Sequence, residues 1–260
     1  MKKYLENFRW ILVYALSSLG KKQMLGVAGA CLVGFLGGHM LGNLKLLNPD
    51  PVAAQASYNA YCQFLTGLKP LIWIIEAVLV AILAVHAGLA LKLKLENRKA
   101  RGKIRYAVTA RKGDAPLASY WMFSSGVLVL VFLVQHLLFI KFGDWYLYRN
   151  AEGEIIRDMW LTTIQAFANP WWTALYVLSL LALGAHLVHA IPSLFRTFGL
   201  AHRRWTPLFT LAGRLVAVVV ILGFAAGVAG AGIQAQTERG RTLIQSSLDA
   251  QQTLQKETAK

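Results

Sequence analysis

The stretch "WWTALYVLSLLALGAHLVHAIPSLF" (residues 171–195) contains no aspartate, glutamate, lysine or arginine. A helix of about 20 apolar residues crosses the roughly 30 Å hydrocarbon core of a bilayer, so this stretch is long enough to span a membrane. It also carries two histidines, His186 and His189, among residues that are otherwise almost entirely apolar. The stretch therefore predicts a transmembrane helix with a role that requires imidazole.

The whole chain shares this apolar character. It has 260 residues, of which 56% are hydrophobic and 15% are charged, whereas a soluble domain carries about 25% charged residues. Five segments are long and apolar enough to span a bilayer: residues 24–46, 70–93, 119–141, 171–195 and 208–233. We therefore expect an all-α fold, a single integral membrane bundle of five transmembrane helices. It would cover residues 1–260, with an interfacial segment at 1–23 and a tail at 234–260.

The charged residues indicate how the bundle is oriented. The net charge is +15, and most lysines and arginines fall in the N-terminal segment and around the second and fourth connectors. Acidic residues gather in the third connector, at Asp144, Glu152, Glu154 and Asp158. Because cytoplasmic loops carry the excess of Lys and Arg, we expect a cytoplasmic N-terminus and an outer C-terminal tail. The charge is then a topology signal and not a nucleic-acid-binding surface, and the basic inner face suits an acidic partner or anionic lipid.

Histidines are concentrated in the predicted spans. Five of the six lie there, and the sixth, His202, lies in an inner loop. A single histidine in a span is usually an interhelical hydrogen-bonding group, but five on four helices favour a cofactor. At 1.5 Å per residue, His39 and His136 lie about 6 to 9 Å outward of the middle of their spans. By the same count, His86 and His189 lie about 7 to 8 Å inward. This pattern predicts two stacked sites, each with two imidazoles.

Haem is the cofactor that two imidazoles satisfy. Zinc requires further ligands, and the two cysteines, Cys31 and Cys62, form no metal-binding pattern. Haem iron needs only two axial ligands, and without a C-x-x-C-H motif the group would be a non-covalent haem b. Glycines beside the histidines, at 37, 38, 88 and 184, allow a flat ring to approach the backbone, although close helix packing explains them equally well.

The fourth span offers two candidate ligands. His186 and His189 are three residues apart and point in similar directions on a helix. The depth match to His86 favours His189 as the inner ligand. His186 remains the alternative ligand, or a hydrogen-bonding partner of a backbone carbonyl or a haem propionate.

Four motifs resemble, in order and spacing, the cytochrome b membrane anchor of di-haem succinate dehydrogenases and fumarate reductases. They are "GFLGGHMLGNLKLL" (34–47), "VHAGLALKLKLENRKAR" (85–101), "SSGVLVLVFLVQHLLF" (124–139) and "LGAHLVHAIPSLFRTFGL" (183–200). The likeness extends over nearly the whole chain. It implies one ligand from each of the first four spans: His39 and His136 for the outer, distal haem, and His86 and His189 for the inner, proximal haem. The spacing from His189 to Arg196 supports the fourth match.

The resemblance also implies a function. The chain would carry electrons through two haem b groups between the quinone pool and two cytoplasmic subunits, an iron–sulfur protein and a flavoprotein that acts on succinate or fumarate. It would lie in the bacterial inner membrane, and it would not itself perform the succinate chemistry. Menaquinone is the quinone that this anchor type favours. The direction of electron flow is left open.

A quinone site is the least constrained expectation. Glu76 is the one acidic residue deep in a predicted span, and Trp73 and Asn43 lie at a similar depth. A carboxylic acid there suits proton exchange with a quinone, and a hydrogen bond to a neighbouring helix explains it equally well. One family member has a glutamate two residues before its fourth ligand, a position that Leu187 occupies here, so a proton pathway of that kind is not expected.

Two other functions fit parts of the pattern. A haem-free transporter or channel could use the histidines to move protons, but it would call for more intramembrane acids than Glu76 alone. The di-haem anchor of a respiratory enzyme with an outer partner would place the basic face on the wrong side.

Overall fold

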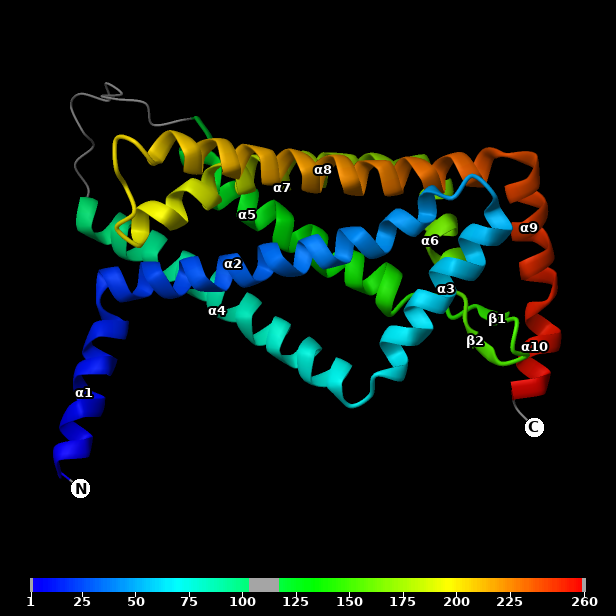
Figure 1. Ribbon diagram of the computed structural model, residues 1–260, viewed down its shortest axis with the longest axis horizontal. Helices are drawn as coiled ribbons and strands as arrows, with labels where there is room; N and C mark the ends of the chain where they lie inside the picture. Colours follow the sequence, from blue (N-terminus) through cyan, green and yellow to red (C-terminus); the bar gives the residue numbers. More distant parts are fainter. Residues whose placement is uncertain (1, 103–116, 259–260) are drawn as a thin grey trace. The chain divides into compact units, whose positions relative to one another are not determined.

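The computed structural model describes residues 2–102 and 117–258, with side chains from residue 9 and from residue 121 onward in these two parts (Figure 1). Within them, five helices are long and apolar enough to cross a membrane. They overlap the five predicted segments and are consistent with an all-α, multi-pass membrane protein. These helices are α2 (Ser18–Asn43), α4 (Leu71–Arg101), α5 (Leu117–His136), α7 (Pro170–Thr197) and α8 (Thr206–Gln236). The basic residues Lys103, Arg105, Arg111 and Lys112 of the second connector lie outside the described residues.

Shorter elements occupy the connectors and the C-terminal segment. A 3-10 turn, η1 (Leu44–Leu47), follows α2, and a π-helical turn, η2 (Leu137–Lys141), follows α5. The remaining helices are α1 (Lys2–Leu16), α3 (Pro51–Gly67), α6 (Met159–Ala168), α9 (Glu238–Asp249) and α10 (Gln251–Thr258). Strands β1 (Leu147–Arg149) and β2 (Ile155–Arg157) pair antiparallel, with Leu147 opposite Arg157. The first and third connectors and the C-terminal tail, for which no elements were predicted, thus contain helices and a pair of strands.

Local sequence explains where several of these elements begin. Pro51 stands in the first turn of α3, where its missing N–H would have no partner in any case. Asp158 caps α6 by accepting a hydrogen bond from the amide of Leu161, and Thr237 caps α9 by accepting one from Gly240. Such caps depend on single polar residues, which hydropathy over long windows does not detect.

The chain divides into two compact units, and each long helix contributes one segment to each unit. Unit 1 comprises Met1–Phe35, Glu76–Val127 and Gly184–Val218, and unit 2 comprises Leu36–Ile75, Leu128–Leu183 and Val219–Lys260. The predicted inner histidines all fall in unit 1, and the predicted outer histidines both fall in unit 2. Each unit is described separately below.

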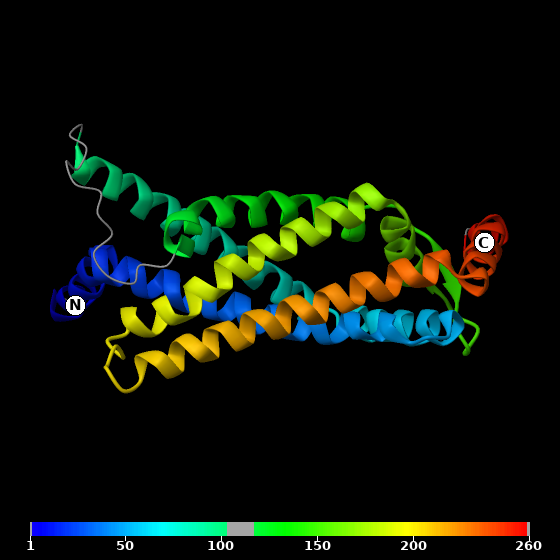
Figure 2. The same ribbon diagram turned by 90° about the horizontal axis from the view of Figure 1, so that it is seen from above.

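Unit 2 contains a well-packed core beside its membrane segments. Trp160, Leu161 and Ile164 of α6 are fully buried and pack with residues of η1, α3 and α8. Along the hairpin, Gln251 of α10 hydrogen-bonds both the amide and the carbonyl of Leu147, so β1 lies beside α10 (Figure 2). This part of the chain therefore folds around its own apolar residues.

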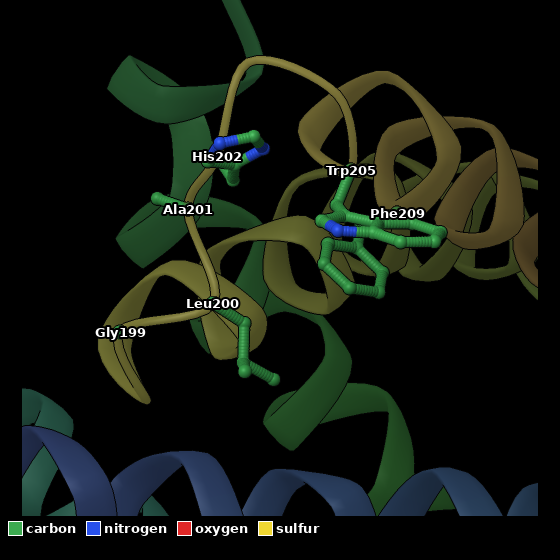
Figure 3. Close-up of a pocket in the computed structure, with 6 residues that line it drawn as sticks. All are labelled: Gly199, Leu200, Ala201, His202, Trp205 and Phe209. Carbon is green, nitrogen blue, oxygen red and sulfur yellow. The ribbon is translucent and has the colours of Figure 1, made fainter.

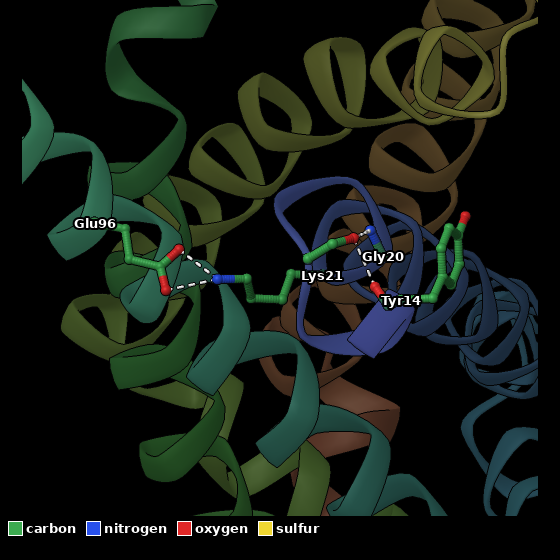
Figure 4. A network of polar contacts seen from close by, with 5 residues as sticks. Tyr14, Gly20, Lys21 and Glu96 are labelled. Atoms are coloured by element: carbon green, nitrogen blue, oxygen red, sulfur yellow. Dashed lines mark hydrogen bonds and ion pairs between the residues drawn. The ribbon is translucent and has the colours of Figure 1, made fainter. Parts of the chain in front are cut away.

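In the described part of unit 1, the helices are held by close contacts and by an ion pair. Lys21 of α2, only 6% exposed, lies 2.6 Å from both carboxylate oxygens of Glu96 on α4 (Figure 4). Gly213 of α8 packs on the ring of Pro192, and Phe195 stacks on Phe209 with ring centres 4.2 Å apart. These contacts join α2 to α4 and α7 to α8, the helices that carry or support the histidines.

Candidate functional site

His86 of α4 and His186 of α7 form a pair in unit 1. Their ring centres are 6.4 Å apart, with an angle of 63° between the planes. His189, the predicted inner ligand, lies one turn further along α7, where the Arg196 guanidinium acts on it electrostatically. The structure therefore brings His186, and not His189, into ring contact with His86.

The position of the proton on His86 follows from its hydrogen bond. Its Nδ1 lies 3.2 Å from the carbonyl oxygen of Leu25 on α2. A carbonyl can only accept, so Nδ1 must carry the proton. The neutral ring then has a bare Nε2, the nitrogen with which it can bind a metal.

The same reasoning applies to His186. Its Nδ1 lies 3.2 Å from the Oγ of Ser125 on α5, and this hydroxyl donates its own proton to the carbonyl of Met122 at 3.0 Å. Because that proton is committed, Ser125 accepts from Nδ1, and Nε2 of His186 is bare. His86 and His186 are therefore held in the tautomer that metal ligation requires, by the kind of partner that orients metal-bound histidines elsewhere.

Two glycines make room for these rings. A Cβ atom at Gly29 would lie 3.2 Å from Cε1 of His86, and one at Gly126 would lie 3.2 Å from Cε1 of His186. Each distance is tighter than an ordinary contact, so each ring packs directly against a glycine backbone. Sequence reasoning missed both glycines because it considered only glycines close to the histidines along the chain.

His39 of α2 and His136 of α5 form the second pair, in unit 2. Their ring centres are 5.9 Å apart and the planes are nearly perpendicular, at 81°. Nδ1 of His136 lies 3.0 Å from the phenol oxygen of Tyr176, and Phe224 of α8 lies beside His39 with ring centres 5.6 Å apart. This is the outer pairing that the depth of the histidines predicted.

Each pair suits one ion between two imidazoles. Nitrogen ligands about 2 Å from a metal ion place the centres of two opposed rings about 6 Å apart. Among the described residues, no group of three or more His, Cys, Asp or Glu side chains converges on a common point. An ion held between the rings of either pair would thus have two ligands among these side chains.

Open space adjoins both pairs. A Cβ atom at Gly37, Gly38 or Gly88 would meet nothing within 4 Å, and all four paired histidines are only partly buried. Helix α4, which is described throughout, buries a single side chain, Leu93. These three glycines near His39 and His86 are therefore not packed against a neighbouring helix.

The three candidate quinone residues lie in different surroundings. Asn43 donates to the carbonyl of His39 at 2.8 Å and accepts from the hydroxyl of Tyr58 at 3.4 Å. Trp73 is 59% exposed, with the ammonium of Lys69 over its ring. Glu76 is half-buried on α4 and interacts with another group of the chain. Asn43 is thus committed to the chain itself, whereas Trp73 lies on an outer face of its helix.

His202 lies apart from the other histidines, in the loop between α7 and α8. With Gly199, Trp205 and Phe209 it lines an open hollow (Figure 3). Its backbone carbonyl accepts from the amides of Trp205 and Thr206, and its Nδ1 accepts from the amide of Arg204. These bonds shape the loop.

Comparison of the chain with models of known protein families, with curated proteins and with solved structures finds no match. The function is therefore inferred from the residues and their geometry.

Proposed function

We propose that the chain is the di-haem cytochrome b anchor subunit of a succinate:quinone oxidoreductase. One observation carries the haem assignment. Two pairs of histidines have ring centres 5.9 and 6.4 Å apart, a separation at which one metal ion would fit between the two imidazoles of each pair. The succinate assignment is supported by the family resemblance of the four histidine-bearing motifs.

The proposed ligands are His39 and His136 for one haem b, and His86 and His186 for the other. His186 replaces His189, which the depth of the residues favoured, because His186 has the ring contact with His86 and the bond to Ser125. A bound haem would supply a one-electron couple at each site. The two imidazoles of each pair would hold the group between them, and the chemistry that it would supply there is electron transfer.

The rest of the chain supports this role. Leu25, Ser125 and Tyr176 hold the imidazole rings, while Gly29 and Gly126 let two of them approach the backbone. The apolar helices exclude water from the sites, which lowers the dielectric constant around any charge that arrives there. His86 and His186 carry their proton on Nδ1, so their Nε2 atoms need no proton transfer to become ligands.

The proposed partners follow from the charge pattern and the resemblance. Arg98, Lys99 and Arg101 end α4, and Arg203 and Arg204 are exposed between α7 and α8. With a cytoplasmic N-terminus these residues form a basic inner face, on which an iron–sulfur subunit carrying a flavoprotein would dock. The membrane would be the bacterial inner membrane and the electron carrier menaquinone, with Glu76 and Trp73 as candidate residues for proton exchange and quinone contact.

The test is the haem content of the purified protein and its reduced-minus-oxidised absorption, for wild type, His186→Ala and His189→Ala. We expect two haem b groups per wild-type chain, one in His186→Ala and two in His189→Ala. His202→Ala is the matched control and should keep both. Loss in His189→Ala alone would return the ligand to His189. A colourless wild-type protein that cannot be loaded with haem would overturn the proposal in favour of a haem-free transporter.

A further inference from the structure

The two histidine pairs differ in what holds their rings. In unit 1, the Nδ1 atoms of His86 and His186 face a backbone carbonyl and a serine hydroxyl whose proton is already donated elsewhere. Both acceptors are fixed, so each ring has one permitted tautomer. In unit 2, Nδ1 of His136 faces a phenol, which can either accept or donate. The tautomer of His136 is therefore not imposed by the protein alone.

Tyr176 is rigidly placed for this contact. Its side chain is 7% exposed and lies at right angles to the rings of Phe132 and Phe167, with ring centres 4.9 and 4.8 Å apart. Such edge-to-face contacts stabilise a ring orientation beyond simple area burial. The phenol oxygen is thereby held 3.0 Å from Nδ1 of His136 and does not depend on a flexible side chain.

We infer that Tyr176 is a positioning residue of the outer haem site, which orients His136 and sets the electron density on its ring. This inference rests on the proposed function, since it assumes that Nε2 of His136 binds iron. When Nε2 is a ligand, Nδ1 carries the proton, and the phenol oxygen of Tyr176 accepts a hydrogen bond from this N–H group. When Nε2 is free, the phenol can donate to Nδ1 instead, and Nε2 then carries the proton.

The hydrogen bond has an electronic consequence. An acceptor on Nδ1–H makes the imidazole a more basic ligand, which stabilises ferric iron relative to ferrous iron. Removing the acceptor should therefore raise the reduction potential of the outer haem. Partners of this kind typically contribute 10- to 100-fold to the affinity of a metal site, so removal should also weaken haem retention there by about that factor.

The experiment compares wild type with Tyr176→Phe, as the full chain in detergent with both haems loaded. Redox titration followed by absorption gives both potentials, and low-spin EPR reports the ligand field of each iron. His136→Ala, which keeps the inner haem, assigns the signals. We expect Tyr176→Phe to raise the potential of the outer haem and shift its EPR signal, while the inner haem is unchanged.

Two controls separate hydrogen bonding from packing. Phe167→Leu disturbs the aromatic contacts of Tyr176 but keeps the phenol, so its outer potential should remain near that of wild type. Ser125→Ala removes the acceptor of His186 and should shift the inner haem alone. An equal shift in Phe167→Leu and Tyr176→Phe would reduce Tyr176 to a packing residue and overturn the inference.

The remaining outcomes distinguish this inference from the proposed function. Two haems in wild type with unchanged outer potential and EPR signal in Tyr176→Phe would overturn the role of Tyr176 and leave the haem assignment intact. No haem in wild type would overturn both. If Tyr176→Phe does not accumulate, 3-fluorotyrosine at position 176 weakens the acceptor with little change of shape. It should raise the outer potential by a smaller amount, and no rise would count against the inference.

Discussion

Two histidines one turn apart, His186 and His189, show how much a single hydrogen bond decides. Their spacing makes both of them candidates, because positions three apart on a helix point in similar directions. Ser125 distinguishes them, since its hydroxyl lies 3.2 Å from Nδ1 of His186. Ser125 is 61 residues away along the chain, so no local pattern links it to His186.

The surroundings of Cys62 should suppress the reactivity of its thiol. Burial raises the pKa of its thiol to about 12, an effect that Arg157 opposes only in part. At pH 8 about one thiol in 10,000 would then be ionised, and the thiolate is the reactive form. We expect Cys62 to react with a water-soluble maleimide at least about 100-fold more slowly in the folded protein than in SDS, as followed by peptide mass spectrometry. Similar rates in both conditions would contradict this environment.

Helix α8 carries no histidine, yet it supports the segment that carries His39. A Cβ atom at Gly223 would collide with the sulfur of Met40, which is part of a flexible side chain, and Gly227 packs on Asn43. At Gly230 the obstacle is backbone, because its Cβ atom would lie 2.8 Å from the carbonyl oxygen of Leu46. Small residues at such positions let two helices approach closely in a membrane.

The Gly230→Ala substitution tests this packing. Leu46 is fully buried and its carbonyl already accepts from Gln234, so the backbone has little freedom to move away. We expect a loss of about 1 to 3 kcal/mol of stability, the usual cost of overpacking, measured by thermal unfolding in detergent. Gly232→Ala is the matched control on the same helix, because a Cβ atom there meets nothing within 4 Å. Equal melting temperatures for the two variants would show that α8 does not pack on η1 in this way.

Across the molecule, the buried carboxylate of Asp158 connects elements that are distant in sequence. It accepts from Gln55 and Asn59 of α3 and from the amide of Leu161, and Gln55 also bonds Ser247 of α9. A second set of bonds runs from Trp160 through Gln234 of α8 to the carbonyl oxygens of η1 and Asn48. Together these contacts fix the folded connectors of unit 2.

The Asp158→Ala substitution should lower the stability of the folded connectors of unit 2. Three buried N–H groups would lose their acceptor, and each unpaired group costs about 1 to 3 kcal/mol. Asp158→Asn is the milder control, because Gln55 can turn its amide to accept from the new NH2 group. The protection of the backbone amides of α3 and α6 from hydrogen exchange measures the effect of each variant. Equal protection in Asp158→Ala and wild type would mean that the network contributes little.

The charge of Asp158 also predicts a pH dependence. Burial is the main cause that raises the pKa of this carboxyl above its ordinary value, against the opposing effect of its hydrogen bonds. The folded state therefore binds the proton more tightly than the unfolded state. Its contribution to stability is complete below the unfolded pKa and is lost as the pH rises through the folded pKa. The stability of wild type relative to Asp158→Asn should therefore fall as the pH rises. A relative stability that increases with pH would contradict this prediction.

The five helices that are long and apolar enough to cross a bilayer, and the histidines on four of them, can be read from the sequence, because the length of an apolar segment determines whether it can span. The pairing of His39 with His136 also follows, since depth along a helix depends only on its rise per residue. The contact of His86 with His186, and the hydrogen bonds of Leu25, Ser125 and Tyr176, depend on how each helix is rotated about its axis. That rotation comes from close packing between residues far apart in the chain, as at Gly29 and Gly126, and hydropathy contains no record of it.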